Sequence, residues 1–160
     1  MCRSRIYFIY ELLIKKCNML RRATMAVVEQ LIKAESDGTV SFGNYKLPEK
    51  KKLENFEHNG NILKVKTYKD ITKLESNENF VYESVPGTAV TGFKETDNGV
   101  EFSVEGDNDA QITLGLLENT EYSVSVGGNS IGKMTTNLGG KLNISVELSG
   151  EGPVEVKVCK

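Results

Sequence analysis

The chain contains few residues that could carry catalysis, and histidine, the usual general base, occurs once. His58 precedes Asn59-Gly60. A single imidazole excludes a relay between two imidazoles and a histidine-rich metal site. Because Asn-Gly is typical of a tight hairpin turn, we expect His58 to be a solvated hairpin residue rather than a general base.

An acidic segment offers a second kind of chemistry, because carboxylate and amide oxygens are the ligands that calcium prefers. It contains Glu105, Asp107, Asn108 and Asp109. The segment lacks the turn glycine and the closing bidentate glutamate of an EF-hand. A solvated acidic turn is therefore the favoured interpretation, and calcium binding is the alternative.

Aromatic side chains could form a platform for sugar rings. The candidates are Tyr45, Phe56, Tyr68, Phe80, Tyr82, Phe93 and Tyr122. The chain has no tryptophan, and aromatic residues in strands mostly fill cores. We therefore expect core packing, with a line of exposed tyrosines as the observation that would favour a carbohydrate-binding module.

Sequence motifs for catalysis, cofactors and metals are absent: the chain has no G-x-S-x-G, no P-loop, no H-E-x-x-H and no C-x-x-C. No catalytic, cofactor-binding or metal-binding residue is assigned, and no cofactor is expected. Carboxylates are abundant, however, and a glycosidase needs only two at the right separation. A glycan hydrolase thus stays open as an alternative.

The elements that would position these residues are strands. Five segments after residue 96 alternate apolar and polar residues with period two, as half-buried antiparallel strands do. Their apolar positions are Val100, Phe102 and Val104; Ile112, Leu114 and Leu116; Tyr122, Val124 and Val126; Leu142, Ile144, Val146 and Leu148; and Val154, Val156 and Val158. Glycine-rich turns separate them, and this spacing predicts an all-β fold, an antiparallel β-sandwich.

Residues 25–95 are less regular. The segment 27–34 fits a short helix or a strand. We expect strands over 39–45, 80–85 and 88–94, and a hairpin of 53–57 with 62–68. Pro86-Gly87 is the expected boundary between a smaller β-rich N-terminal lobe, 25–85, and a β-sandwich domain, 86–160.

Charge and cysteine content limit the partners. All four arginines precede residue 25, and residues 25–160 carry 14 lysines against 21 acidic residues, a formal charge of −7. This acidic body lacks the guanidinium fork for anions and repels a phosphate backbone, so no nucleic acid is expected. Cys159 is its only cysteine, which favours a cytoplasmic location, with secretion as the alternative.

Residues 1–24 form a basic leader whose short apolar run is interrupted by Glu11. The run is too short to span a bilayer as a helix. The favoured interpretation is a mis-called start, because Arg21-Arg22 can be encoded by purine-rich codons that resemble a ribosome-binding site before Met25. The alternatives are an amphipathic anchor and a signal peptide. No membrane association is expected if the chain starts at Met25.

Two resemblances concern the body. The strand-and-turn run from Gln111-Ile-Thr-Leu-Gly-Leu to Val154-Glu-Val-Lys-Val resembles the accessory β-sandwich domains of bacterial polysaccharide-degrading enzymes. The whole body, from Met25-Ala-Val-Val-Glu through Val85-Pro-Gly-Thr-Ala-Val, is similar to short bacterial proteins catalogued as endosialidase. That resemblance implies hydrolysis of sialic-acid polymers, for which sialidases use an arginine cluster and a tyrosine nucleophile; the body supplies tyrosines but no arginine.

These observations together predict a non-enzymatic β-sandwich protein that acts as an accessory or interaction module. Its exposed strand edges would pair in a homo-oligomer or with a protein partner. The alternatives are a carbohydrate-binding module, with a glycan as partner, and a glycan hydrolase of the endosialidase type.

Overall fold

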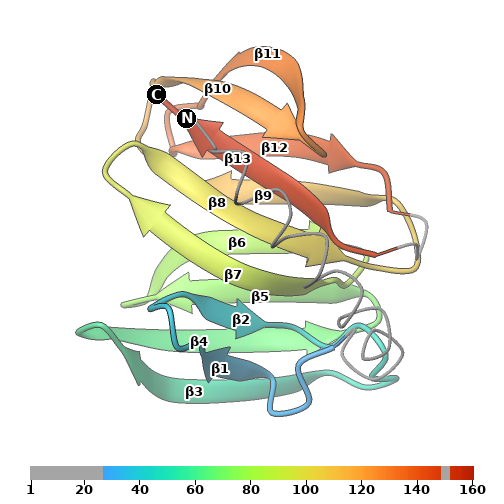
Figure 1. Ribbon diagram of the computed structural model, residues 1–160. Coiled ribbons are helices and arrows are strands. Elements are labelled where there is room, and N and C mark those ends of the chain that lie inside the picture. Colours follow the sequence, from blue (N-terminus) through green and yellow to red (C-terminus); the bar gives the residue numbers. More distant parts are fainter. Residues whose placement is uncertain (1–26, 149–151) are drawn as a thin grey trace, which may run out of the picture.

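The computed structural model describes residues 27–148 and 152–160, and these residues form thirteen strands and no helix. The strands make two antiparallel sheets that face each other (Figure 1). The prediction of an antiparallel β-sandwich is confirmed. The expected leader, residues 1–24, lies outside the described residues, and so do all four arginines.

Sheet A, nearer the viewer in Figure 1, has seven strands. Their spatial order is β1 (Ile32–Ala34), β2 (Val40–Phe42), β7 (Ala89–Thr96), β8 (Gly99–Glu105), β13 (Val154–Cys159), β10 (Glu121–Val126) and β11 (Asn129–Thr135). Sheet B has six strands, in the order β12 (Lys141–Val146), β9 (Ala110–Gly115), β6 (Asn79–Val85), β5 (Ile71–Ser76), β4 (Asn61–Tyr68) and β3 (Lys51–His58).

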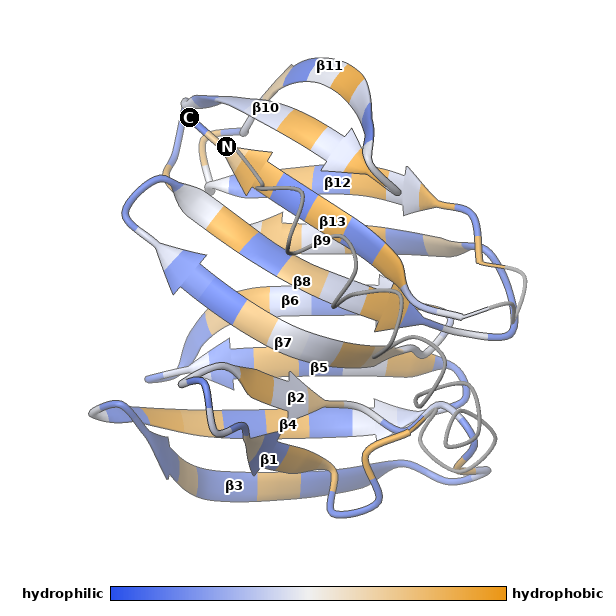
Figure 2. Ribbon diagram, in the orientation of Figure 1, coloured by the Kyte–Doolittle hydropathy of each residue, from blue (hydrophilic) through white to orange (hydrophobic). Residues whose placement is uncertain are grey.

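The core lies between the sheets, because alternate residues of most strands point inward. Figure 2 shows this as hydrophobic and hydrophilic bands that alternate along the strands. An aromatic cluster forms its centre: the Tyr82 ring meets the rings of Phe42 and Phe102 edge-on, with centroids 5.3 and 5.6 Å away. Such edge-to-face pairs add about 0.5–1.5 kcal/mol each to the burial of the rings.

Most predicted strands are present, with ends shifted by a few residues. The hairpin around Asn59-Gly60 joins β3 to β4, and both turn residues have positive φ, 49° and 79°, as a type I′ turn requires. In the segment 27–34 the strand alternative is right only for β1. Leu31, at a φ of 73°, belongs to the turn that precedes β1. Two strands, β5 and β11, were not predicted.

The expected boundary at Pro86-Gly87 falls where the chain passes from β6 in sheet B to β7 in sheet A, through a cis Val85–Pro86 bond. Strands from before and after this point occur in both sheets. Most buried hydrophobic residues of both segments belong to one cluster.

Candidate functional site

One end of the sandwich is hollowed where turns from both sheets meet. The hollow has a volume of about 600 Å³. Its floor consists of buried side chains of β2, β4, β5 and β7, namely Val40, Leu63, Leu74 and Phe93. Its rim is polar and includes Asp37, His58, Asn59, Asn61, Ser76, Lys94, Glu95, Thr96 and Asp97. An apolar floor with a few polar groups around it is the usual form of a ligand site.

His58 fixes one wall of this hollow. Its Nε2 atom lies 3.0 Å from the carbonyl oxygen of Gly38, and Asn59 Nδ2 donates to the same oxygen at 3.3 Å. We assign the hydrogen to His58 Nε2, because a carbonyl oxygen only accepts. The tip of the β3–β4 hairpin in sheet B is thereby tied to the turn between β1 and β2 in sheet A. His58 is in the expected hairpin, but its ring joins the two sheets.

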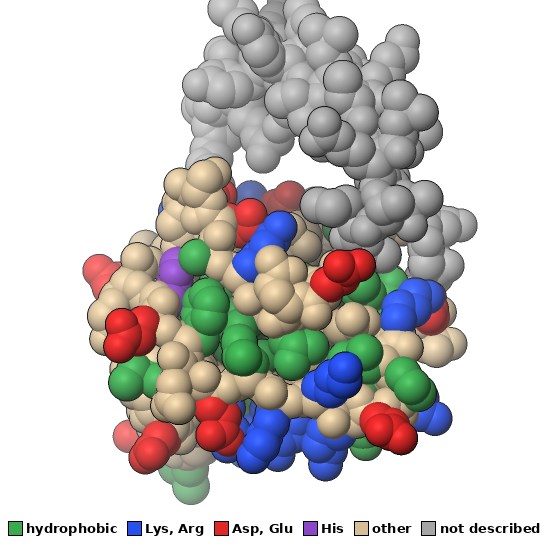
Figure 3. Space-filling model, turned by 90° about the horizontal axis from the view of Figure 1, so that it is seen from below, with side chains coloured by type: hydrophobic (Ala, Val, Ile, Leu, Met, Phe, Trp, Pro, Cys, Tyr) green, Lys and Arg blue, Asp and Glu red, His purple; other side chains and the backbone are tan. Residues whose placement is uncertain are grey.

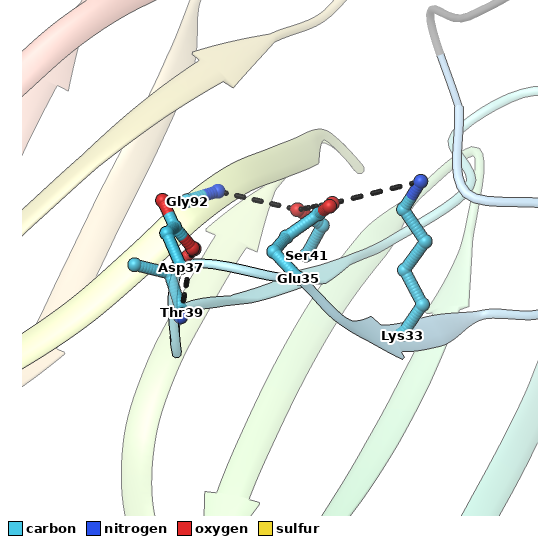
Figure 4. A network of polar contacts seen from close by, with 6 residues as sticks. All are labelled: Lys33, Glu35, Asp37, Thr39, Ser41 and Gly92. Carbon is cyan, nitrogen blue, oxygen red and sulfur yellow. Dashed lines mark hydrogen bonds and ion pairs between the residues drawn. The ribbon is translucent and has the colours of Figure 1, made fainter.

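The turn between β1 and β2 is itself held by side-chain bonds (Figure 4). Asp37 Oδ1 accepts hydrogen bonds from the backbone N–H and the hydroxyl of Thr39, at 3.0 and 2.6 Å. Ser41 Oγ donates to Glu35 Oε1 at 2.7 Å and accepts from the Gly92 N–H at 3.2 Å. Lys33 Nζ lies 3.6 Å from the same Glu35 oxygen. These bonds set the position of the rim relative to β7.

Two carboxyl groups of the rim have pKa values shifted in opposite directions. The hydrogen bonds from Thr39 lower the pKa of Asp37, whereas desolvation at the hollow raises the pKa of Glu95. Such a separation is the pattern that lets one carboxyl group act as an acid while another stays ionised. Sequence reasoning singled out neither residue, because Asp37 lies in the turn before β2 and Glu95 lies near the end of β7, and only the fold brings them to one hollow.

The acidic segment between β8 and β9 is used for structural bonds. Asp107 forms an ion pair with Lys46 at 2.8 Å, and Asp109 Oδ1 accepts the Leu148 N–H at 2.9 Å. Within residues 27–148 and 152–160, no three histidine, cysteine, aspartate or glutamate side chains gather in a way that could hold a metal ion. Through these two bonds, the segment links the loop after β2 and the residues that follow β12 to the C-terminal end of β8.

The aromatic residues lie mostly in the core. Tyr45, Tyr82 and Tyr122 are buried, and Tyr68 is half-buried with Lys50 Nζ 5.8 Å from its ring centre. Phe93 is buried, and Phe56 and Phe80 are half-buried. The described part of the chain therefore presents no line of exposed tyrosines, and the expected core packing is confirmed for Tyr45, Tyr82, Phe93 and Tyr122.

A chain of buried hydroxyl groups runs along the inner side of sheet B. Thr88 Oγ1 lies 2.8 Å from the Tyr82 hydroxyl and 2.7 Å from Ser84 Oγ. Thr72 Oγ1 donates to the Thr88 carbonyl at 2.8 Å and lies 2.8 Å from Thr67 Oγ1. Burial raises the pKa of Tyr82, so its hydroxyl stays neutral. These bonds hold the crossover after Pro86 against the sheet.

Each sheet ends in two edge strands, and three of the four are short or irregular. β1 has three residues, β3 has a bulge between Leu53 and Phe56, and β11 is bulged around Ile131 opposite β10. Bulges and short edges discourage pairing with another chain. From below, where β1 and β3 end the sheets, a row of hydrophobic side chains lies among charged ones (Figure 3).

The fourth edge strand, β12, is straight. Its six residues pair with β9 in unbroken register, from Lys141 opposite Gly115 to Val146 opposite Ala110. Its inward side chains are buried, while Lys141, Asn143 and Ser145 are exposed on the outer face. Asn143 accepts a hydrogen bond from Thr113 at 2.6 Å, and Ser145 accepts one from Gln111 at 2.6 Å. These bonds hold both side chains over β9, and among residues 27–148 and 152–160 no second strand pairs with the backbone of β12.

Comparison with protein-family models, with curated proteins and with solved structures gave no match. The resemblances to endosialidase-labelled proteins and to accessory domains therefore remain predictions. No helix in the described part of the chain is long and apolar enough to cross a membrane. The fold and the two features above, the end hollow and the β12 edge, are the basis for a functional proposal.

Proposed function

We propose that this protein is a non-enzymatic interaction module that binds its partner by adding a strand to β12. The observation that carries the proposal is the open edge of β12, which has regular register and no bulge. Strand addition at such an edge gains affinity from main-chain hydrogen bonds and specificity from side chains on the two faces.

The groups best suited to chemistry support this proposal, because they are engaged in holding the fold. His58 donates to a backbone carbonyl, Asp37 accepts from Thr39, and Asp107 is paired with Lys46. The outer face beside β12 is polar, with Asn143 and Ser145 already bonded to β9. A partner strand would therefore meet a rigid edge, which lowers the entropic cost of association.

The test uses a proline at the edge. Ser145→Pro removes an N–H that points away from β9, and proline is tolerated at such a position. Ser145→Ala is the matched control, because it keeps the N–H. Both variants and the wild type are immobilised and exposed to an extract of the producing cell. A partner retained by wild type and Ser145→Ala but lost by Ser145→Pro supports the proposal; retention by all three overturns it.

A second candidate is glycan binding or hydrolysis at the end hollow, favoured by the opposite pKa shifts of Glu95 and Asp37. A glycan array would reveal binding, and incubation with polysialic acid followed by a reducing-end assay would reveal turnover. Turnover that is lost in Glu95→Gln but retained in Glu101→Gln, on the outer face of β8, would support this candidate. Absence of both binding and turnover would reject it.

A further inference from the structure

We propose that the strand added to β12 is β12 of a second copy of this chain, so that two copies join their B sheets across a two-fold axis at Ile144. This inference rests on the proposed function, since it names the partner for the same edge. It is an interaction surface argued from the backbone groups that the edge leaves available and from the charges that flank them.

The available backbone groups belong to two residues. The Leu116 N–H donates to the Gly140 carbonyl, which makes Lys141 and Gly115 a non-hydrogen-bonded pair of the ladder. Because hydrogen-bonding direction alternates along an antiparallel strand, Lys141, Asn143 and Ser145 direct their N–H and C=O groups away from β9. Lys141 is already used: its N–H donates to Asn137 Oδ1 at 3.0 Å, and its carbonyl accepts the Asn137 N–H at 3.2 Å. Asn143 and Ser145 remain.

Two identical edges with two such residues fit each other in one antiparallel register. If Asn143 lies opposite the partner's Ser145, the reverse pair forms by symmetry, and all available N–H and C=O groups are bonded. Placing Asn143 opposite Asn143 of the second copy would instead bring Ser145 against Lys141, whose groups Asn137 occupies. The bonds of Asn137 therefore disfavour the register with Asn143 on the axis, whereas the register with Ile144 on the axis bonds both available residues of each copy.

Charge favours the same arrangement. Lys141 precedes and Glu147 follows the two available residues, and both side chains are exposed. Antiparallel pairing places each Lys141 beside Glu147 of the other copy, while parallel pairing would place like charges together.

The interface is small, because it consists of a few residues on each side, and interfaces below about 1,200 Å² are typical of weak complexes. Sedimentation velocity should therefore be measured from about 10 µM to about 1 mM. We expect the wild type and Ser145→Ala to shift from monomer to dimer over this range, and Ser145→Pro to remain monomeric with an unchanged far-UV circular dichroism spectrum.

A charge exchange tests the register. Lys141→Glu should weaken the dimer by about tenfold or more, and the double variant K141E/E147K should restore it. A wild type that stays monomeric, a Ser145→Pro variant that dimerises as well as wild type, or a double variant no better than the single one would each overturn the inference. If the wild type is monomeric but still captures an edge-dependent partner, self-pairing fails while the proposed function stands.

Discussion

Replacing Thr88 with valine tests the role of the buried hydroxyl chain. The Thr88 side chain is fully buried, and its hydroxyl is bonded to those of Tyr82 and Ser84, which are buried as well. Valine has nearly the same shape as threonine. The change therefore removes two hydrogen bonds and leaves two buried hydroxyl groups without a partner, but it opens no large cavity. At about 1 kcal/mol for each lost bond and about 1 kcal/mol for each buried hydroxyl group left without a partner, we expect a loss of about 4 kcal/mol.

The assay is urea unfolding followed by circular dichroism. With a slope of about 2 kcal/mol/M, the midpoint should fall by about 2 M. Tyr82→Phe should cost only about 1 kcal/mol, since Thr88 keeps its bond to Ser84. The triple variant of Tyr82→Phe, Ser84→Ala and Thr88→Val should lose less free energy of unfolding than the sum of the single changes, because it leaves none of these three hydroxyl groups buried without a partner. A Thr88→Val loss no larger than that of the exposed control Thr91→Val would refute the reasoning.

Three further changes test other parts of the fold. Glu95→Gln should raise the thermal midpoint at pH 7. Desolvation raises the pKa of Glu95 above its usual 4.5, so the ionised carboxylate destabilises the folded state. Thermal melts at several pH values should show this gain disappear near pH 3, where the carboxyl group is protonated in both the folded and the unfolded state. Asp107→Asn should change the free energy of unfolding by less than about 1 kcal/mol, since the Lys46–Asp107 pair is exposed. Gly99→Ala should cost more than about 3 kcal/mol in the same assay, because its Cβ would collide with the Val158 carbonyl oxygen.

The strands that were predicted from alternation alone are those whose inner face is apolar throughout. β8, β9, β10, β12 and β13 alternate cleanly because valine, isoleucine, leucine and aromatic residues fill the space between the sheets. β5 was not predicted, because a polar residue, Thr72, occupies one of its inward positions and interrupts the apolar alternation. The Thr72 hydroxyl is hydrogen-bonded inside the core. β11 was not predicted, because nearly all its side chains are exposed and its sequence therefore lacks an alternation of apolar and polar residues.

The candidate site could be predicted less well than the fold. The Asn59-Gly60 hairpin was evident from the sequence, but nothing in its neighbourhood indicates that His58 reaches Gly38, 20 residues earlier. The hollow likewise assembles turns that are far apart in the chain. For β12 a signal did exist: an unbroken alternation from Lys141 to Val146 without proline or glycine. That pattern predicts a strand, whereas its place at the edge of the sheet depends on the topology.

The position of β13 has a consequence for biosynthesis. This strand follows all other described strands in the sequence, yet it lies inside sheet A, between β8 and β10. While the chain emerges from the ribosome, sheet A stays split in two halves until residues 154–159 are released, although the consecutive hairpins of β3 to β6 can form early. During that interval the backbone edges of β8 and β10 that β13 will cover are unpaired. A polypeptide that stalls just short of β13 should be a substrate for chaperones, and a free peptide with the sequence of β13 should be able to complete it.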